Sequence, residues 1–242
     1  LAQALLRDPE VLRLNAEQGL ERTFADILSA VEGAWRGAPQ TSAFMKTLRE
    51  SRARAAVTVA LGDISGTWPL EVVTASLSAF ADAMISAAVR QQLAAAATAG
   101  AVTLSNQDDP AAGSGYVVLA MGKLGSRELN YSSDVDLVPL WNPERVRTTE
   151  SAAPSGVYVR ITREIVRILQ EHTPDGYVFR ADLRLRPDSG ATPVAISTHA
   201  AETYYESVGQ NWERAAMIKA RPVAGDLSAG AGFVRALTPF LW

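Results

Sequence analysis

Two short strand-like runs around a glycine-punctuated turn constrain this chain more than any other stretch of its sequence. Residues 116–120 (YVVLA) are apolar and β-branched, residues 122–126 (GKLGS) form the turn, and residues 134–141 (DVDLVPLW) form the second run. We call residues 122–126 the glycine turn. The pattern predicts two strands that bracket a small loop and one turn of helix.

The second run places two carboxylates side by side. Because successive side chains of a strand point to opposite faces, Asp134 and Asp136 share one face, and Val135 and Leu137 share the other. Adjacent carboxylates repel each other, and the pKa of each rises unless a positive charge lies between them. Hard oxygen ligands suit Mg²⁺ or Mn²⁺, so we expect a divalent cation here.

The glycine turn predicts the other half of such a site. Gly122 and Gly125 allow positive φ and close backbone approach, and Ser126 can direct a hydroxyl and an amide at a phosphate. A surface strand that ends in two solvated aspartates is the alternative. That interpretation is preferable for an isolated D-x-D pattern, but the adjoining turn favours the site.

Composition narrows the classes of partner. The 242 residues carry 23 basic and 26 acidic side chains, a net charge of −3 that argues against nucleic acid. The chain has no cysteine, which fits a reducing cytoplasm. No apolar run approaches membrane-spanning length and no signal peptide is visible, so we expect no membrane partner. A start at Leu1 and an end at Trp242 suggest a piece of a longer protein.

The order of patterns along the chain predicts an α+β fold. Apolar residues recur at helical spacing over residues 1–100, and residues 101–115 form a linker or loop. We expect a catalytic sheet within residues 116–196 and helices over residues 197–242.

A third carboxylate lies on a predicted strand farther along. Residues 177–186 alternate between apolar side chains and the set Val178, Arg180, Asp182, Arg184 and Arg186. A helix between this strand and the first aspartate strand favours a parallel or mixed sheet, which would place Asp182 beside Asp134 and Asp136. An exposed Asp–Arg ladder of little energetic value is an equally weighted alternative for this segment alone.

Several basic residues are candidate contacts for a phosphate or a nucleotide. They are Arg184, Arg186, Arg214, Lys219 and Arg221, and Trp212 is a candidate for stacking on a base. Each of these residue types more often has a structural role.

Three sequence blocks together resemble the glutamine synthetase adenylyltransferase family, also called glutamate-ammonia-ligase adenylyltransferase. They are MGKLGSRELNYSSDVDL at 121–137, DLRLRP at 182–187 and NWERAAMIKARPVAGD at 211–226. Members carry two polymerase-β-like nucleotidyltransferase domains, of which the N-terminal one removes AMP from a tyrosine of glutamine synthetase by phosphorolysis and releases ADP. The C-terminal one attaches AMP from ATP. The NYSSD and WERAAMIKAR segments resemble the N-terminal, adenylyl-removing half.

The resemblance implies roles for individual residues and for partners. Asp134, Asp136 and Asp182 would be the catalytic, metal-binding carboxylates, with Mg²⁺ or Mn²⁺ as the ion. Gly122, Gly125 and Ser126 would contact phosphate, together with Arg184, Arg186, Lys219 and Arg221. Adenylylated glutamine synthetase, inorganic phosphate and ADP would be the reaction partners, and the full-length enzyme would also bind a PII-type signalling protein.

Two alternatives remain open. The chain could be the ATP-dependent half that attaches AMP, since that half uses the same carboxylates. It could also be a non-catalytic regulatory or interaction module, although an intact set of aspartates and an intact glycine turn argue against this.

Overall fold

A five-stranded mixed sheet lies at the centre of the computed structural model, which describes residues 2–37, 40–149 and 153–242. Four of its strands run in the order β3-β2-β1-β5. The fifth, β4, also pairs with β2 and lies outside this order. β1 is antiparallel to β2 and β5, whereas β3 and β4 are parallel to β2. The strands are β1 (Tyr116–Ala120), β2 (Val135–Trp141), β3 (Ala181–Asp182), β4 (Ile196–Ser197) and β5 (Arg221–Gly225).

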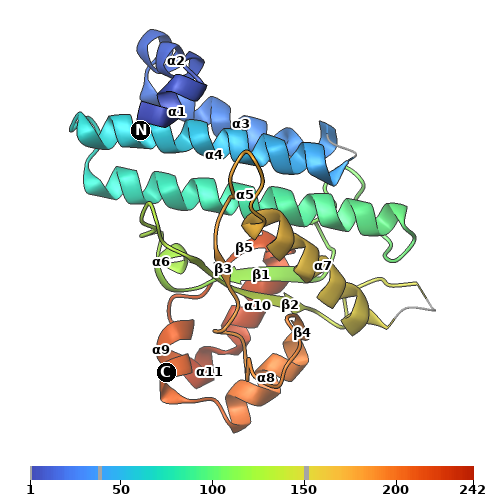
Figure 1. Cartoon of the computed structure of the whole chain (residues 1–242). Coiled ribbons are helices and arrows are strands. Elements are labelled where there is room, and N and C mark those ends of the chain that lie inside the picture. Colours follow the sequence, from blue (N-terminus) through green and yellow to red (C-terminus); the bar gives the residue numbers. More distant parts are fainter. Residues whose placement is uncertain (1, 38–39, 150–152) are drawn as a thin grey trace.

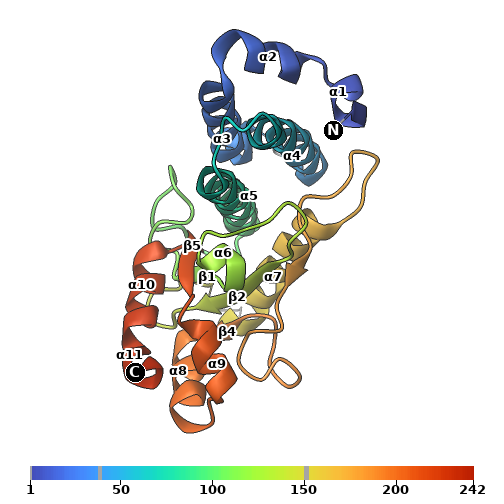
Figure 2. The same cartoon turned by 90° about the vertical axis from the view of Figure 1, so that its left-hand side faces the viewer.

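Helices cover both faces of this sheet (Figures 1 and 2). Alternate residues of β1 show the two faces: Val118 belongs to a core shared with α3, α4, α5 and α7, while Val117 and Leu119 belong to a second core with α8 and α10. The helices before the sheet are α1 (Ala2–Arg7), α2 (Glu10–Gln18), α3 (Leu20–Gly37), α4 (Thr41–Ile64) and α5 (Leu70–Thr98). The later ones are α6 (Gly122–Gly125), α7 (Pro154–Gln170), α8 (Thr198–Ser207), α9 (Asn211–Met217), α10 (Leu227–Ala236) and α11 (Thr238–Leu241).

The expected α+β class, with a small mixed sheet and flanking helices, is confirmed. The first core runs from α3 through α5 and β1 to β5, so the helical region and the sheet share one set of apolar contacts. The division of the chain at residues 101–115 stays a prediction.

α5 corrects the expectation that no apolar run approaches membrane-spanning length. This helix is 29 residues long, and an 18-residue window within it has a mean hydropathy of 1.7. However, 56% of that window is buried inside the protein, where α5 packs on α3, α4, α7 and β5. Its apolar character therefore serves the protein core, which a helix covered on several sides requires.

Two predicted elements differ from the structure. Only Ala181 and Asp182 of the predicted 177–186 strand pair in the sheet, and Val178, expected on the polar face, is fully buried. The strand ends because Asp182 accepts a hydrogen bond from the backbone N–H of Arg184 (2.8 Å), which turns the chain. The region 197–242, expected to be helical, contains the strand β5 between α9 and α10.

A buried arginine joins the helical layer to the segment that leads into β3. Arg49 on α4 is 2% exposed, and its guanidinium donates to the carbonyl oxygens of Met45 (2.9 Å), Gly176 (2.8 Å), Ile168 (3.2 Å) and Glu171 (2.5 Å). Two of these carbonyls belong to the last turn of α7 or follow it, where backbone acceptors lack helical partners. Burial lowers the pKa of Arg49 from its usual value.

We predict that Arg49→Met lowers the free energy of unfolding by about 2–4 kcal/mol, because it leaves several buried carbonyl groups without donors. Denaturant unfolding followed by circular dichroism measures this change. Lys46→Met on the same helix is the control, since the Lys46 side chain is 62% exposed and should shift the free energy by at most about 0.5 kcal/mol. Equal effects of the two substitutions would contradict the assigned role of Arg49.

Candidate active site

Two of the three predicted carboxylates are neighbours across a pair of parallel strands. Asp136 of β2 is in register with Asp182 of β3, and Val135 is in register with Ala181. The backbone N–H of Val135 donates to the carbonyl of Arg180 (2.9 Å), which extends this pairing by one residue. The two strands pair in parallel, with α7 between them in sequence, so the expected parallel arrangement is confirmed.

The glycine turn packs directly on Asp136. Gly122 begins α6 with φ = +55°, and a Cβ atom placed on it would lie 2.8 Å from Oδ2 of Asp136. The backbone N–H of Met121 donates to the carbonyl of Asp136 (2.9 Å). Glycine is required here both for the positive φ and for the close approach of the carboxylate.

Arginine side chains neutralise the other two carboxylates. Nε of Arg180 lies 2.5 Å from Oδ1 of Asp134, and the same guanidinium donates to the carbonyl of Ser132 (2.7 Å). Arg184 bonds Asp182 through Nε at 2.8 Å and through Nη2 at 2.5 Å. The Arg184 side chain is 84% exposed, so solvent screens this pair and its energetic value is small.

Asp136 is the carboxylate left without an arginine of its own. Its pKa is raised by burial, then by the neighbouring carboxylates Asp182 and Asp134, while Arg184 lowers it. The pKa of Asp182, in contrast, is lowered by its hydrogen bond from Arg184. The charge at Asp136 is thus the one that gains most from an added cation.

The donor set fits a hard divalent cation, although the three carboxylates do not converge in this conformation. Within the described ranges, no three acidic, histidine or cysteine side chains lie close enough together to hold a metal ion. Asp134 and Asp182 are instead engaged by Arg180 and Arg184. Arg184 engages both oxygens of Asp182, whereas Arg180 engages only Oδ1 of Asp134, and the metal site stays a proposal.

The second glycine of the turn is constrained by close approach rather than by its φ angle. Gly125 is buried, and a Cβ atom on it would lie 2.0 Å from the carbonyl oxygen of Lys219. Its φ is not positive, unlike that of Gly122. Ser126 closes the turn, since its hydroxyl and its N–H both donate to the carbonyl of Gly122, at 2.9 and 3.1 Å. Both Ser126 donors that were expected to meet phosphate thus have partners within the turn.

Four of the five basic candidates, those to which the resemblance assigns a phosphate contact, fall into two groups. Arg184 and Lys219 have exposed side chains near the carboxylates and the turn, with Nζ of Lys219 3.7 Å from Glu128. Arg186 donates to carbonyl groups of its own loop, including those of Leu183 (2.8 Å) and Ser189 (2.7 Å). Arg221 bonds Asp82 and the glycine turn. A phosphate role stays a prediction for all four, and the structure favours the first two.

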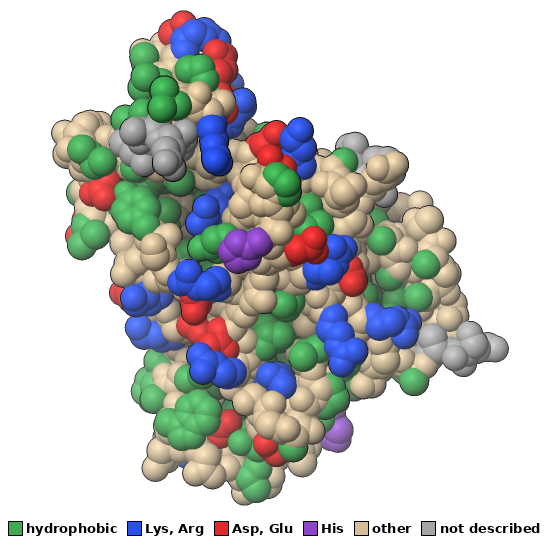
Figure 3. Space-filling view, viewed as in Figure 1, with side chains coloured by type: hydrophobic (Ala, Val, Ile, Leu, Met, Phe, Trp, Pro, Cys, Tyr) green, Lys and Arg blue, Asp and Glu red, His purple; other side chains and the backbone are tan. Residues whose placement is uncertain are grey.

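The surface around the site carries charge of both signs. Figure 3 shows basic side chains around a small acidic patch below the helical layer, in the area where β3 and α6 lie in Figure 1. Charges of both signs therefore lie close together on this surface.

Sequence reasoning missed the residues that other elements contribute to this site. The sequence places Arg180 on the polar face of the predicted strand, but no local pattern predicts its bond to Asp134. On α5, Asp82 accepts a hydrogen bond from Arg221, and Ser78 accepts one from the backbone N–H of Leu129. These contacts join residues 139 and 51 positions apart, and no local pattern signals them.

We predict that Gly125→Ala destabilises the protein by more than about 2 kcal/mol, because the added methyl group meets backbone that cannot move away cheaply. Thermal or denaturant unfolding tests this. The control is Gly33→Ala in α3, where an added Cβ meets nothing within 4 Å and alanine improves helix propensity. A Gly125→Ala protein as stable as the parent would show that the turn is not held against residue 219.

Comparisons with known proteins agree with the sequence blocks. A family model described as glutamate-ammonia ligase adenylyltransferase matches residues 1–236. Relatives named bifunctional glutamine synthetase adenylyltransferase/adenylyl-removing enzyme include one from Mesorhizobium japonicum, 46% identical over 237 residues, and one from Rhizobium meliloti, 47% identical over 240. A third, from Xanthobacter autotrophicus, is 52% identical over 198 residues.

These alignments cover 98%, 97% and 82% of this chain, in the order given, but only 24%, 24% and 20% of the relatives. The chain therefore spans about a quarter of the length of the curated relatives it matches. With nearly its whole length matched by the family model, this chain belongs to the glutamate-ammonia ligase adenylyltransferase family.

Proposed function

We propose that this chain is an adenylyl-removing nucleotidyltransferase domain that transfers the adenylyl group from a modified tyrosine of glutamine synthetase to inorganic phosphate and so releases ADP. The observation that carries the proposal is the register of Asp136 with Asp182 on parallel strands, with Gly122 of the glycine turn packed on Asp136. This geometry brings an acidic cluster and a glycine turn to one point, and that combination suits transfer of a nucleotidyl group.

The direction of the reaction rests on sequence resemblance. Residues 130–134 read NYSSD and residues 212–221 read WERAAMIKAR, as in the adenylyl-removing half of the family. The relatives are named for both activities, so the names alone do not distinguish the halves. The adenylylating direction, with ATP as donor, is accordingly the second candidate function, and a non-catalytic module is the third.

In the proposed reaction, an oxygen of inorganic phosphate attacks the phosphorus of the adenylyl group. A new P–O bond forms to give ADP, the P–O bond to tyrosine breaks, and the tyrosine oxygen takes up a proton from solvent. Phosphate is already ionised at neutral pH, so attack requires no strong general base. The main barrier is the approach of two anions, which positive charge must offset.

The residues of the site meet this requirement in distinct ways. Asp134, Asp136 and Asp182 would hold Mg²⁺ or Mn²⁺, which when bound neutralises charge on the transferred phosphoryl group. Arg184 and Lys219, with exposed side chains, would bind phosphate oxygens. A phosphate contact at Gly122, Gly125 or Ser126 is part of the same proposal, and it would require the contacts that these residues now make with Asp136, Lys219 and the turn itself to rearrange.

The setting of this activity follows from the same proposal. The chain would act in the cytoplasm on adenylylated glutamine synthetase, and a PII-type signalling protein would bind the full-length enzyme. Neither nucleic acid nor a membrane is a required partner. The net charge of −3 argues against nucleic acid as a partner.

Phosphate dependence is the test of the proposed function. We predict that the purified chain, mixed with adenylylated glutamine synthetase and Mg²⁺, releases ADP only when inorganic phosphate is present. Chromatographic separation of nucleotides measures the product. Transfer of AMP from ATP to the unmodified synthetase, with no phosphate-dependent release, would assign the chain to the adenylylating half instead.

We further predict that Asp134→Asn and Asp182→Asn each reduce nucleotide release by at least about a hundredfold, because each loses a charge needed at the phosphoryl group without a large change in volume. Circular dichroism and thermal unfolding should show a folded protein in both cases. Asp26→Asn, on α3 and half-exposed, is the matched control and should retain parental activity. Full activity in both site variants would reject the assignment of the carboxylates.

A further inference from the structure

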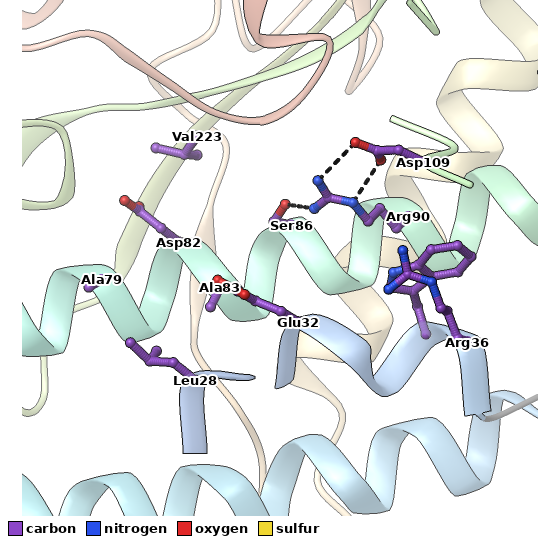
Figure 4. Close-up of a pocket in the computed structure, with 11 residues that line it drawn as sticks. Leu28, Glu32, Arg36, Ala79, Asp82, Ala83, Ser86, Arg90, Asp109 and Val223 are labelled. Carbon is purple, nitrogen blue, oxygen red and sulfur yellow. Dashed lines mark hydrogen bonds and ion pairs between the residues drawn. The ribbon is translucent and has the colours of Figure 1, made fainter. Parts of the chain in front are cut away.

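We propose that Asp82 is a positioning residue, which holds the glycine turn in place through Arg221. Asp82 lies on α5, in the helical region that precedes the sheet, and its carboxylate lines a cleft of about 540 Å³ between α3, α5 and β5 (Figure 4). The inference deepens the proposed function, on which its kinetic test rests, because it adds a residue of the helical region to the site.

Arg221 connects Asp82 to the turn. Its Nη1 and Nη2 donate to the two carboxylate oxygens of Asp82, at 2.8 and 3.1 Å. Its Nη2 and Nε also donate to the carbonyls of Leu124 (2.9 Å) and Gly125 (3.2 Å). Arg221 was a candidate phosphate ligand on sequence grounds, but these four bonds direct its donors to the protein itself. The planar guanidinium serves both partners at once because its donors are fixed in a fork.

The turn needs support from outside because it has little of its own. α6 contains only four residues, and a single helical turn is not stable by itself. Its two glycines contribute no side-chain contacts to hold it. Arg221 donates to the carbonyls of Leu124 and Gly125 at the end of the turn, and Gly125 itself lies against the carbonyl of Lys219. The segment 219–221 therefore fixes the end of the turn, and Asp82 fixes Arg221.

The same helix also holds the loop that follows the turn. Ser78 lies one helical turn before Asp82 and is 1% exposed, and its hydroxyl accepts a hydrogen bond from the backbone N–H of Leu129 (3.1 Å). α5 is largely buried and packs on three helices and β5, so it is a rigid support. α5 thus holds this segment at two places, at residues 124 and 125 through Arg221 and at Leu129 directly.

A second ion pair in the same cleft supplies a matched control. Arg90, also on α5, bonds Asp109 at 2.8 Å, and Figure 4 shows this pair farther along α5, across the cleft from Asp82. The side chains of both pairs are partly exposed, at 21% and 25% for Arg221 and Asp82 and at 27% and 37% for Arg90 and Asp109. Neither Arg90 nor Asp109 bonds the glycine turn in the hydrogen bonds of the described residues.

The test compares Asp82→Asn with Asp109→Asn by hydrogen–deuterium exchange. We expect Asp82→Asn to accelerate exchange of the amides in residues 121–129 by about tenfold or more, with the rest of the chain unchanged. The turnover rate for phosphate-dependent ADP release should fall by about tenfold, because the turn is no longer held in its productive position. Asp109→Asn should change neither quantity. Arg221→Gln should match Asp82→Asn, and the double variant should be no worse than either, since the residues act as one unit.

Unchanged exchange in residues 121–129 of Asp82→Asn would overturn the proposal, as would equal acceleration in Asp109→Asn. A general loss of protection throughout the chain, with a lowered melting temperature, would also overturn it, since this would show only structural weakening. Failure of the proposed function has a different signature. In that case the parent chain releases no ADP, while the local acceleration in Asp82→Asn still shows that Asp82 positions the turn.

Discussion

The site depends on a parallel pairing that is only two residues long. β3 cannot hold its place by backbone hydrogen bonds alone, because two residues form too few of them. Its position comes from α7, which is packed in the core before it, and from Arg49, which binds carbonyls at the end of that helix and at Gly176. Gln170, the last residue of α7, also donates to the carbonyl of Ala181 (2.5 Å). Core contacts far from Asp182 therefore place its carboxylate beside Asp136.

This pairing has an electrostatic cost that the arginines offset. Asp136 is half-buried and faces two other carboxylates, so its ionised form is disfavoured. Arg180 and Arg184 supply the counter-charge from positions that are 54% and 84% exposed. Exposed pairs of this kind contribute little free energy and exchange partners readily. Under the proposed function, a bound cation would therefore compete with the two arginines for these carboxylates.

Local patterns in the sequence predicted the features that depend on local geometry. Strand alternation placed Asp136 and Leu137 on opposite faces of their strand. The intervening helix favoured the parallel pairing that brings Asp182 to Asp136, and Gly122 has the positive φ that glycine allows. β5 was missed because its residues, RPVAG, include proline and glycine, which are poor strand formers, and it is stabilised by pairing with the central β1. The contribution of α5 was missed for a similar reason: Asp82 meets Arg221 only through the tertiary fold.

The sequence block at residues 211–226, which carries much of the family resemblance, has mostly structural roles in this fold. Glu213 is buried and completes the capping box of α9, while Arg221 holds the glycine turn. Gly225 has φ = +81°, and the buried Asp226 caps α10. In this structure the block therefore stabilises the architecture of the domain, and its contribution to the proposed direction of the reaction rests on resemblance alone.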